Sequence, residues 1–144
     1  MSVEPKKVLY SCVKLDHDSA TRLLRVADKM DELHCYEKAH HMTIKFGKQD
    51  VSCLPLGQEV KLKVVGYAYN KGVQAVHVQV DHPNLEVSNA FPHVTVSHST
   101  HGKPKDSNPL LEETQGGLKL DGPVLTGTVG YYLKGKNTTH FYTH

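Results

Sequence analysis

The sequence predicts one α+β domain, spanning residues 1–144, whose strands pair mostly antiparallel. Segments in which apolar and polar residues alternate with period two outnumber segments with helical spacing. Turn-forming residues separate most of these segments by short connections. The chain has the length of one ordinary domain, and its 38% hydrophobic content can close a single core.

The first third of the chain predicts a strand, a helix and a second strand. Residues 8–15 are rich in β-branched and other apolar residues, which favours an extended strand. In residues 20–33, apolar side chains recur every three or four positions, and Asp18 or Ser19 is a suitable N-cap. Residues 40–46 alternate with period two, so we expect a second strand there.

The middle of the chain predicts a β-hairpin followed by another strand. Residues 59–69 and 73–80 have the composition of strands. The short segment between them contains Asn70 and Gly72, which suit a tight turn. Residues 91–97 alternate again and predict the next strand.

The last third predicts a short helix and two closing strands. Asn108 followed by Pro109 combines a favoured N-cap with a favoured first helical residue, and the glycines at 116–117 are typical of a helix end. Residues 124–133 and 138–142 then have the pattern of strands. The prediction therefore contains seven strands and two helices.

Composition restricts the functional class. The formal net charge is only +2, far below the excess of a non-specific duplex DNA binder, so we expect any contact with nucleic acid to be local. The three cysteines show no Cys-x-x-Cys spacing and no charged-then-apolar leader opens the sequence. We therefore expect a reducing compartment, the cytosol or alternatively the nucleus. No apolar stretch approaches the roughly 20 residues of a membrane span, so no membrane contact is expected.

Two segments share one pattern of four residues. Residues 41–44 read His-Met-Thr-Ile and residues 93–96 read His-Val-Thr-Val. Because side chains alternate across a strand, the histidine and the threonine of each segment are predicted to share one face. Requiring both apolar flanks lowers the number of copies expected by chance from about 0.7 to about 0.1. The candidate site residues are His41, Thr43, His93 and Thr95.

Alternation also predicts the orientation of neighbouring polar side chains. Lys45 continues the first face and is a candidate contact to an RNA phosphate. Ser97 continues the second face and is a candidate hydrogen-bond donor. His40 is predicted on the apolar face of its strand, as an edge residue, and His98 on the face opposite His93.

These paired His-x-Thr strands resemble the signature of the 2H phosphoesterase superfamily, which includes RNA 2′,3′-cyclic phosphodiesterases and 2′-5′ RNA ligase-like proteins. The similarity covers most of the chain, although the helix expected before the second motif is weak. The motifs lie only 52 positions apart. This spacing, with Gly102-Lys103-Pro104 and Ser107-Asn108, is most similar to the compact cyclic phosphodiesterase module of multidomain tRNA ligases.

The resemblance implies a bilobal, pseudo-twofold fold in which mostly antiparallel sheets line a central cleft, with about two helices outside. It implies a phosphoric diester hydrolase of RNA processing or repair, acting on an RNA 3′ end or a nucleotide with a 2′,3′-cyclic phosphate and leaving a 2′-phosphate. His41 and His93 would be catalytic, and Thr43 and Thr95 would bind phosphate. The alternatives are a 2′-5′ phosphodiesterase or ligase with the same four residues, and a non-catalytic module that binds RNA ends. We expect a monomer.

The residue types suit this chemistry on physical grounds. Opening a cyclic phosphate requires the attacking water to lose a proton and the leaving ribose oxygen to gain one, on opposite sides of phosphorus. A neutral imidazole serves as base and an imidazolium as acid, each worth about 10²–10⁴ in rate. Threonine hydroxyls donate to the non-bridging oxygens. The sequence leaves open which histidine is the base.

Eleven histidines raise the alternative of a metal site. Structural zinc needs four converging ligands, usually from spaced pairs. Neither the adjacent His40 and His41 nor the separated cysteines have such spacing. We therefore expect no metal and no other cofactor.

Overall fold

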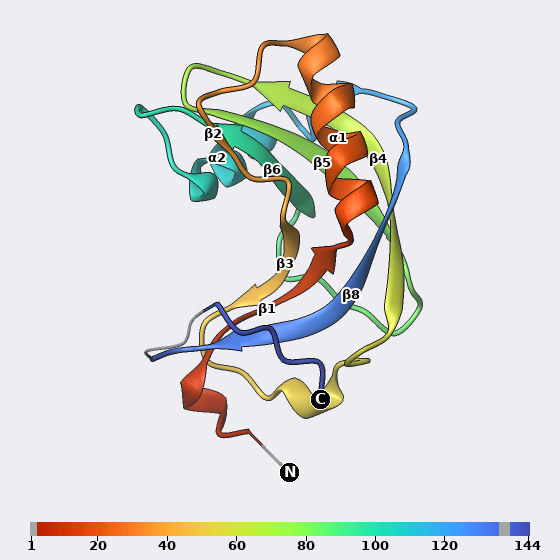
Figure 1. Cartoon of the computed structure of the whole chain (residues 1–144), viewed down its shortest axis with the longest axis vertical. Helices are drawn as coiled ribbons and strands as arrows, with labels where there is room; N and C mark the ends of the chain where they lie inside the picture. Colours follow the sequence, from red (N-terminus) through yellow and green to blue (C-terminus); the bar gives the residue numbers. More distant parts are fainter. Residues whose placement is uncertain (1–2, 136–138) are drawn as a thin grey trace.

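The computed structural model describes residues 3–135 and 139–144 (Figure 1). The strands are β1 (Val8–Leu15), β2 (Tyr36–Glu37), β3 (His41–Phe46), β4 (Glu59–Tyr69), β5 (Val73–Asp81), β6 (His93–His98), β7 (Leu118–Lys119) and β8 (Val124–Leu133). The α-helices are α1 (His17–Met30) and α2 (Ser107–Glu113). Short 3-10 helices are η1 (Pro5–Lys7), η2 (Val51–Cys53) and η3 (Pro104–Asp106).

The strands form one antiparallel sheet. Its order is β2-β6-β3-β1-β8-β4-β5, with β7 paired to β4. Because β5 also pairs with β6, the six strands from β6 through β5 in this order close into a barrel. The predicted α+β class, with antiparallel strands and two α-helices, is confirmed for the part of the chain that the structure describes.

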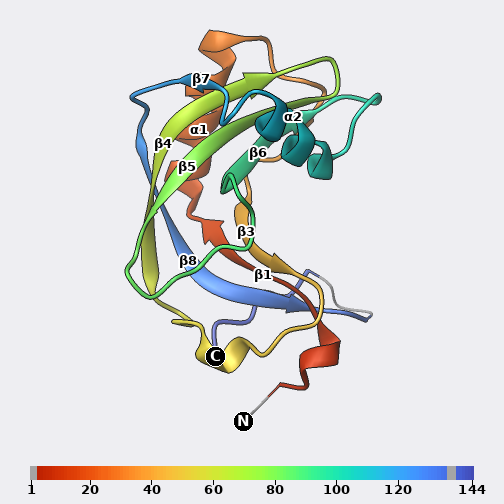
Figure 2. The same ribbon diagram turned by 180° about the vertical axis from the view of Figure 1, so that it is seen from behind.

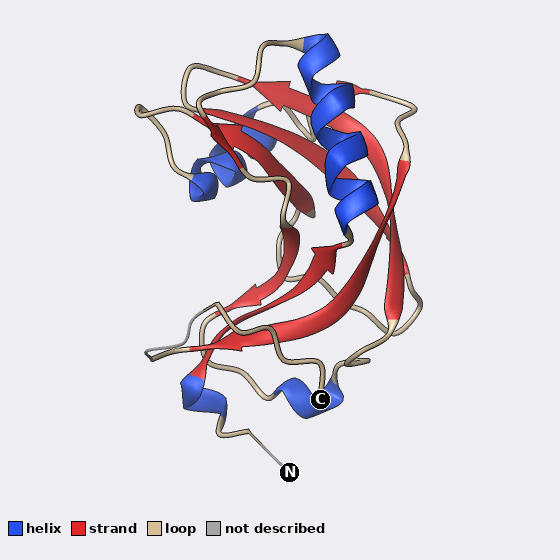
Figure 3. Cartoon of the chain, in the orientation of Figure 1, coloured by secondary structure: helices blue, strands red, loops and turns tan. Residues whose placement is uncertain are grey.

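The two α-helices lie against opposite faces of the sheet, as the front and back views show (Figures 1 and 2). Colouring by secondary structure shows the layer of strands between them (Figure 3). From α1, Leu23 and Ala27 are spaced four apart and pack in the main core. From α2, Leu110 and Leu111 pack with Ala75 in a second cluster. No described helix is long and apolar enough to cross a membrane.

Helix α1 begins three residues before the predicted position. Asp16 is the N-cap, instead of Asp18 or Ser19, because its carboxylate accepts a hydrogen bond from the Ser19 N–H at 2.7 Å. The helix ends at Met30, since Asp31 adopts an extended backbone with φ −149°. The residues predicted to continue the helix to position 33 are therefore not helical.

The longer predicted strands are confirmed. The bounds of residues 8–15, 59–69 and 124–133 agree with β1, β4 and β8. The predicted strand 138–142 is different: residue 138 lies outside the described residues, and Tyr142 pairs with Tyr131 as an isolated bridge.

Candidate functional site

The two motif strands are neighbours in the sheet. Met42 of β3 pairs with Val94 of β6, and both side chains are fully buried in the main core. The histidines and threonines on either side of this pair therefore point away from the core. At and next to a paired position, Cβ atoms on neighbouring strands lie roughly 5–8 Å apart. Both imidazoles therefore lie on the same side of these two neighbouring strands.

A cavity of about 990 Å³ opens where these side chains converge. Predicted site residues in its lining are His41, Thr43, Lys45, His93 and Thr95. Tyr10, His40 and Phe46, which the sequence did not indicate, also line it.

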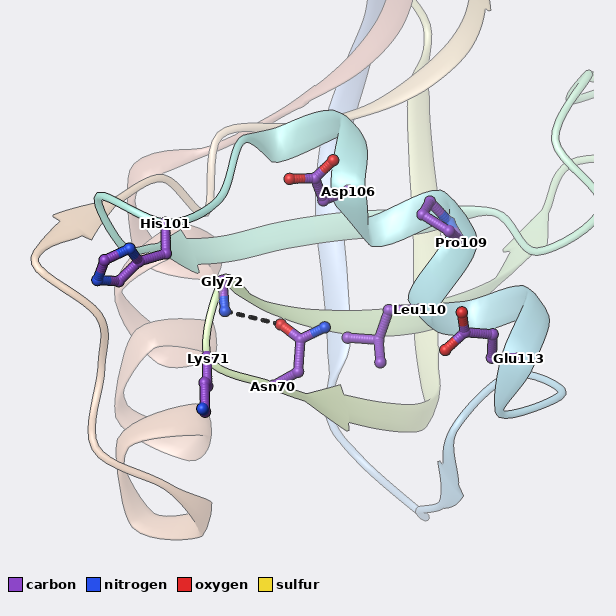
Figure 4. Close-up of a pocket in the computed structure, with 8 residues that line it drawn as sticks. All are labelled: Asn70, Lys71, Gly72, His101, Asp106, Pro109, Leu110 and Glu113. Atoms are coloured by element: carbon purple, nitrogen blue, oxygen red, sulfur yellow. Dashed lines mark hydrogen bonds between the residues drawn. The ribbon is translucent and has the colours of Figure 1, made fainter.

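A smaller depression of about 380 Å³ lies between the β4–β5 turn and the chain from His101 to Glu113 (Figure 4). Within that turn the Gly72 N–H donates to Asn70 Oδ1 at 2.9 Å. The charged side chains around it stand apart from one another in Figure 4. No residue of either His-x-Thr motif lines it, so we assign the candidate site to the larger cavity.

His41 is surrounded by other rings. It stacks on Tyr10, with ring centroids 5.0 Å apart, and its Nδ1 lies 2.9 Å from Nδ1 of His40. Burial is the main reason why the pKa of His41 is lowered to about 4. The nearby charges of His40, His93 and Lys38 lower this pKa further. His41 is therefore neutral at pH 7 in the free protein.

His93 has a fixed ring orientation. Its Nδ1 lies 3.0 Å from the carbonyl oxygen of Phe91. Because a carbonyl only accepts, Nδ1 carries the proton, and neutral His93 keeps a lone pair on Nε2. Burial lowers the pKa of His93, and the bond to Phe91 acts in the opposite direction. The side chain thus offers a proton acceptor beside the cavity.

The two threonines differ in their hydrogen bonds. Thr95 Oγ1 donates to the Pro104 carbonyl at 3.2 Å and shares a hydrogen bond with Ser107 Oγ at 2.8 Å. The Thr43 hydroxyl bonds to no other described residue. Thr43 is therefore available to a ligand, whereas Thr95 also anchors the segment that leads into α2.

The charges around the cavity favour an anion. Lys38, Lys45 and Lys105 line it, against the carboxylate of Glu37. The net positive field attracts a negatively charged ligand. Within the described ranges, no three His, Cys, Asp or Glu side chains gather closely enough to hold a metal ion.

Ser97 does not line the cavity, so the prediction that it extends the His93 face is wrong. Thr95 pairs with Ala75, but Ser97 pairs with Gln74, which leaves the intervening residue in a β-bulge. An extra residue reverses the alternation beyond it. Ser97 is fully buried, and its Oγ donates to Gln74 Oε1 at 2.7 Å and accepts a backbone N–H at 3.0 Å. Its role is to connect the sheet internally.

A second bulge, at Ile44 in β3, changes which later residue lies on the same face of the strand as His41 and Thr43. Lys45 pairs with Ser11, whereas Phe46 pairs with Tyr10. Residues that pair across two strands share a face, so Phe46 continues the Tyr10 face. Lys45 lines the cavity as predicted, and Phe46 joins it.

His40 and His98 also differ from the alternation rule. Ala39 has a positive φ of 48°, held by its N–H donating to the Thr95 carbonyl at 2.9 Å. This left-handed residue interrupts the extended chain, so His40 reaches the cavity and not the core. The bulge in β6 returns His98 to the face of Thr95. Neither the positive φ of an alanine nor a bulge has a signal in this sequence.

Comparison with known proteins places the site in context. A model of the fungal tRNA ligase phosphodiesterase domain matches residues 41–122, more than half of the chain, including both His-x-Thr segments. A crystal structure of a fungal RNA kinase has a TM-score of 0.58 at 15% sequence identity, covering 99% of this chain and 45% of that chain. At this identity the likeness shows the fold alone, and this chain spans less than half the length of that protein. No curated protein matches the sequence.

Proposed function

We propose, on the premise that this chain belongs to the fungal tRNA ligase phosphodiesterase domain family, that it hydrolyses 2′,3′-cyclic phosphates on RNA 3′ ends or nucleotides. The observation that carries this proposal is that one histidine from β3 and one from β6 line the same lysine-containing cavity. The reaction proceeds without a metal or other cofactor and serves RNA processing or repair.

Two protons move on opposite sides of the phosphorus. The oxygen of a water attacks phosphorus while the water gives a proton to Nε2 of His93. The bond between phosphorus and O3′ breaks, and O3′ takes a proton from His41. The products are a 2′-phosphate and a free 3′-hydroxyl. The lone pair that the Phe91 carbonyl leaves on Nε2 of His93 supports its assignment as the base.

His41 has to be protonated to act as the acid, although its pKa in the free protein is about 4. A phosphate beside the ring favours the charged imidazolium and raises that pKa. Substrate and proton therefore bind together. After the reaction His93 carries a proton and His41 is neutral. The reverse reaction therefore exchanges the roles of the two histidines.

The remaining cavity residues bind the phosphate. Thr43 donates its hydroxyl to one non-bridging oxygen, where negative charge develops. Thr95 donates to the other after its proton turns from the Pro104 carbonyl. Lys45 contacts an RNA phosphate through its charge.

The finer architecture is part of the proposal. We treat β1, β3 and β8 as one lobe and β4, β5 and β6 as the other, related by a pseudo-twofold axis through a central cleft. Two features support this: each lobe contributes one His-x-Thr strand, and each of those strands has a bulge at the residue after its threonine, Ile44 and Val96.

The decisive experiment offers the protein a 2′,3′-cyclic mononucleotide and a 2′-5′-linked dinucleotide, each in EDTA, and follows phosphorus by NMR. The proposal expects the cyclic phosphate to become a nucleoside 2′-phosphate, with the activity kept in EDTA and lost in His93→Ala. Cleavage of the dinucleotide alone would identify a 2′-5′ phosphodiesterase. Binding without cleavage would identify an RNA-end-binding module, and loss of activity in EDTA would identify a metal enzyme.

A further inference from the structure

Two aromatic rings, those of Phe46 and Tyr10, lead from solvent to the first motif histidine, His41. Phe46 is 72% exposed and stacks nearly parallel to Tyr10, with 6.1 Å between ring centroids and 7° between planes. Tyr10 in turn stacks on His41 at 5.0 Å. All three residues line the cavity. The Phe46 ring therefore lies at most about 11 Å from the His41 ring, the sum of those two separations.

Phe46 does not serve the core. Ile44, two residues before it, is 2% exposed and packs in the main core, whereas Phe46 belongs to none of the hydrophobic clusters of the described residues. Its ring leaves a large apolar surface in water beside a cavity that lysine, histidine and threonine side chains also line. Covering such a surface with the flat, apolar face of a ligand lowers the free energy of the complex.

The loop between β5 and β6 forms another wall of this space. The N–H and the hydroxyl of Ser88 both donate to the Ile44 carbonyl, at 3.0 Å and 2.9 Å. These two bonds attach the loop to β3 next to Phe46. Ser88 and Asn89 line the cavity, so the space beside the Phe46 ring is bounded and not open on every side.

We infer that Phe46, supported by Tyr10, is the stacking platform for the nucleobase of the nucleotide whose cyclic phosphate lies between His41 and His93. This inference rests on the proposed function. A separation of at most about 11 Å between the rings of Phe46 and His41 accommodates one nucleoside, with its base on Phe46, its ribose between, and its phosphate at the imidazole. Every base has a π-face, so the platform accepts all four bases with little preference.

Removing the ring tests this directly. Phe46→Ala raises KM for a 2′,3′-cyclic mononucleotide roughly 10-fold, while kcat stays within about twofold, since stacking contributes to binding and not to proton transfer. Phe46→Tyr keeps the ring and the wild-type KM. A base-free substrate, methyl riboside 2′,3′-cyclic phosphate, has the same KM with Phe46→Ala and wild type. Leu118→Ala is the matched control, because Leu118 is 66% exposed on β7 and outside the cavity.

An equal loss for the nucleotide and the base-free substrate, or no loss for either, would overturn the platform. Equilibrium binding distinguishes failure of the stacking platform from failure of the proposed function. Should the wild type hydrolyse no cyclic phosphate, the proposed function fails. Adenosine 2′-phosphate that binds Phe46→Ala roughly 10-fold more weakly than wild type, with inorganic phosphate unchanged, would still support stacking. Equal affinity, or no binding of the nucleotide to the wild type, would reject it.

Discussion

The Nδ1 atoms of His40 and His41 lie 2.9 Å apart, with the two rings nearly perpendicular at 86°. In such a contact one ring donates and the other accepts, so the two neutral imidazoles hold their protons on different nitrogens. The pKa of both side chains is lowered, mainly by burial, and for His41 the adjacent His40 adds to the effect. The contact couples the proton positions of the two rings, and we expect His40 to be a positioning residue for His41.

Replacing His40 should change the pH dependence of the reaction. In His40→Ala, a neighbour that lowers the His41 pKa is lost and water reaches the ring, so this pKa rises from about 4 toward 6.5. NMR titration of His41 measures the rise, and the pH at which kcat/KM is highest moves in the same direction. His101→Ala, an exposed histidine on the smaller depression, is the control. An unchanged His41 titration would contradict this role.

The two motif histidines should matter far more for turnover than for folding. His41→Ala and His93→Ala are each expected to lower kcat about 10²–10⁴-fold, because each removes one proton-transfer group. Thr43→Ala and Thr95→Ala should cause smaller losses, since they remove donors to the phosphate oxygens. Single-turnover rates measure the effect, and circular dichroism checks the fold. Full turnover in either histidine variant would reject the proposed site.

Ser97 should behave in the opposite way. Ser97→Ala leaves the buried Gln74 Oε1 without its donor, and this should cost about 1–3 kcal/mol of unfolding free energy with kcat unchanged. Urea unfolding and steady-state kinetics on the same preparation measure both quantities. A variant with wild-type stability and reduced kcat would place Ser97 in the site after all.

Mild acid should destabilise the protein through its buried histidines. The pKa of His41 is about 4 when folded and about 6.5 when unfolded, and that of His93 is also lowered on folding. In this window the unfolded chain binds more protons, so stability that is present above pH 6.5 is lost as pH falls toward 4. Urea midpoints between pH 7.5 and 4.5 measure the loss, and His41→Gln should reduce its slope. Parallel curves for variant and wild type would contradict the lowered pKa.

The sequence predicted the elements that are long enough to show a repeating pattern of apolar and polar residues. Strands β1, β4 and β8 agree with their predicted bounds because eight to eleven residues display a clear composition and period. Strands β2 and β7 have two residues each and show no period. The start of α1 was misplaced because three acceptable capping residues lie within four positions, and only the folded backbone selects Asp16.

The side chains that alternation misplaced all follow a local break in a strand. Ser97 and His98 follow the bulge in β6, and His40 follows the left-handed Ala39. A bulge is a mismatch in residue number between two paired strands, so it depends on the partner as much as on the strand that contains it.

The amino-acid sequence by itself determined that each histidine shares a face with its threonine and that an apolar residue opposite holds the pair in place. This follows because alternation is a property of one extended strand. Only the tertiary structure decided that the two faces meet at one cavity, since the pairing of Met42 with Val94 joins strands far apart in the chain. It also decided that His40 and Phe46 complete the cavity while Ser97 does not, because strand register and backbone φ are set by contacts with neighbouring strands.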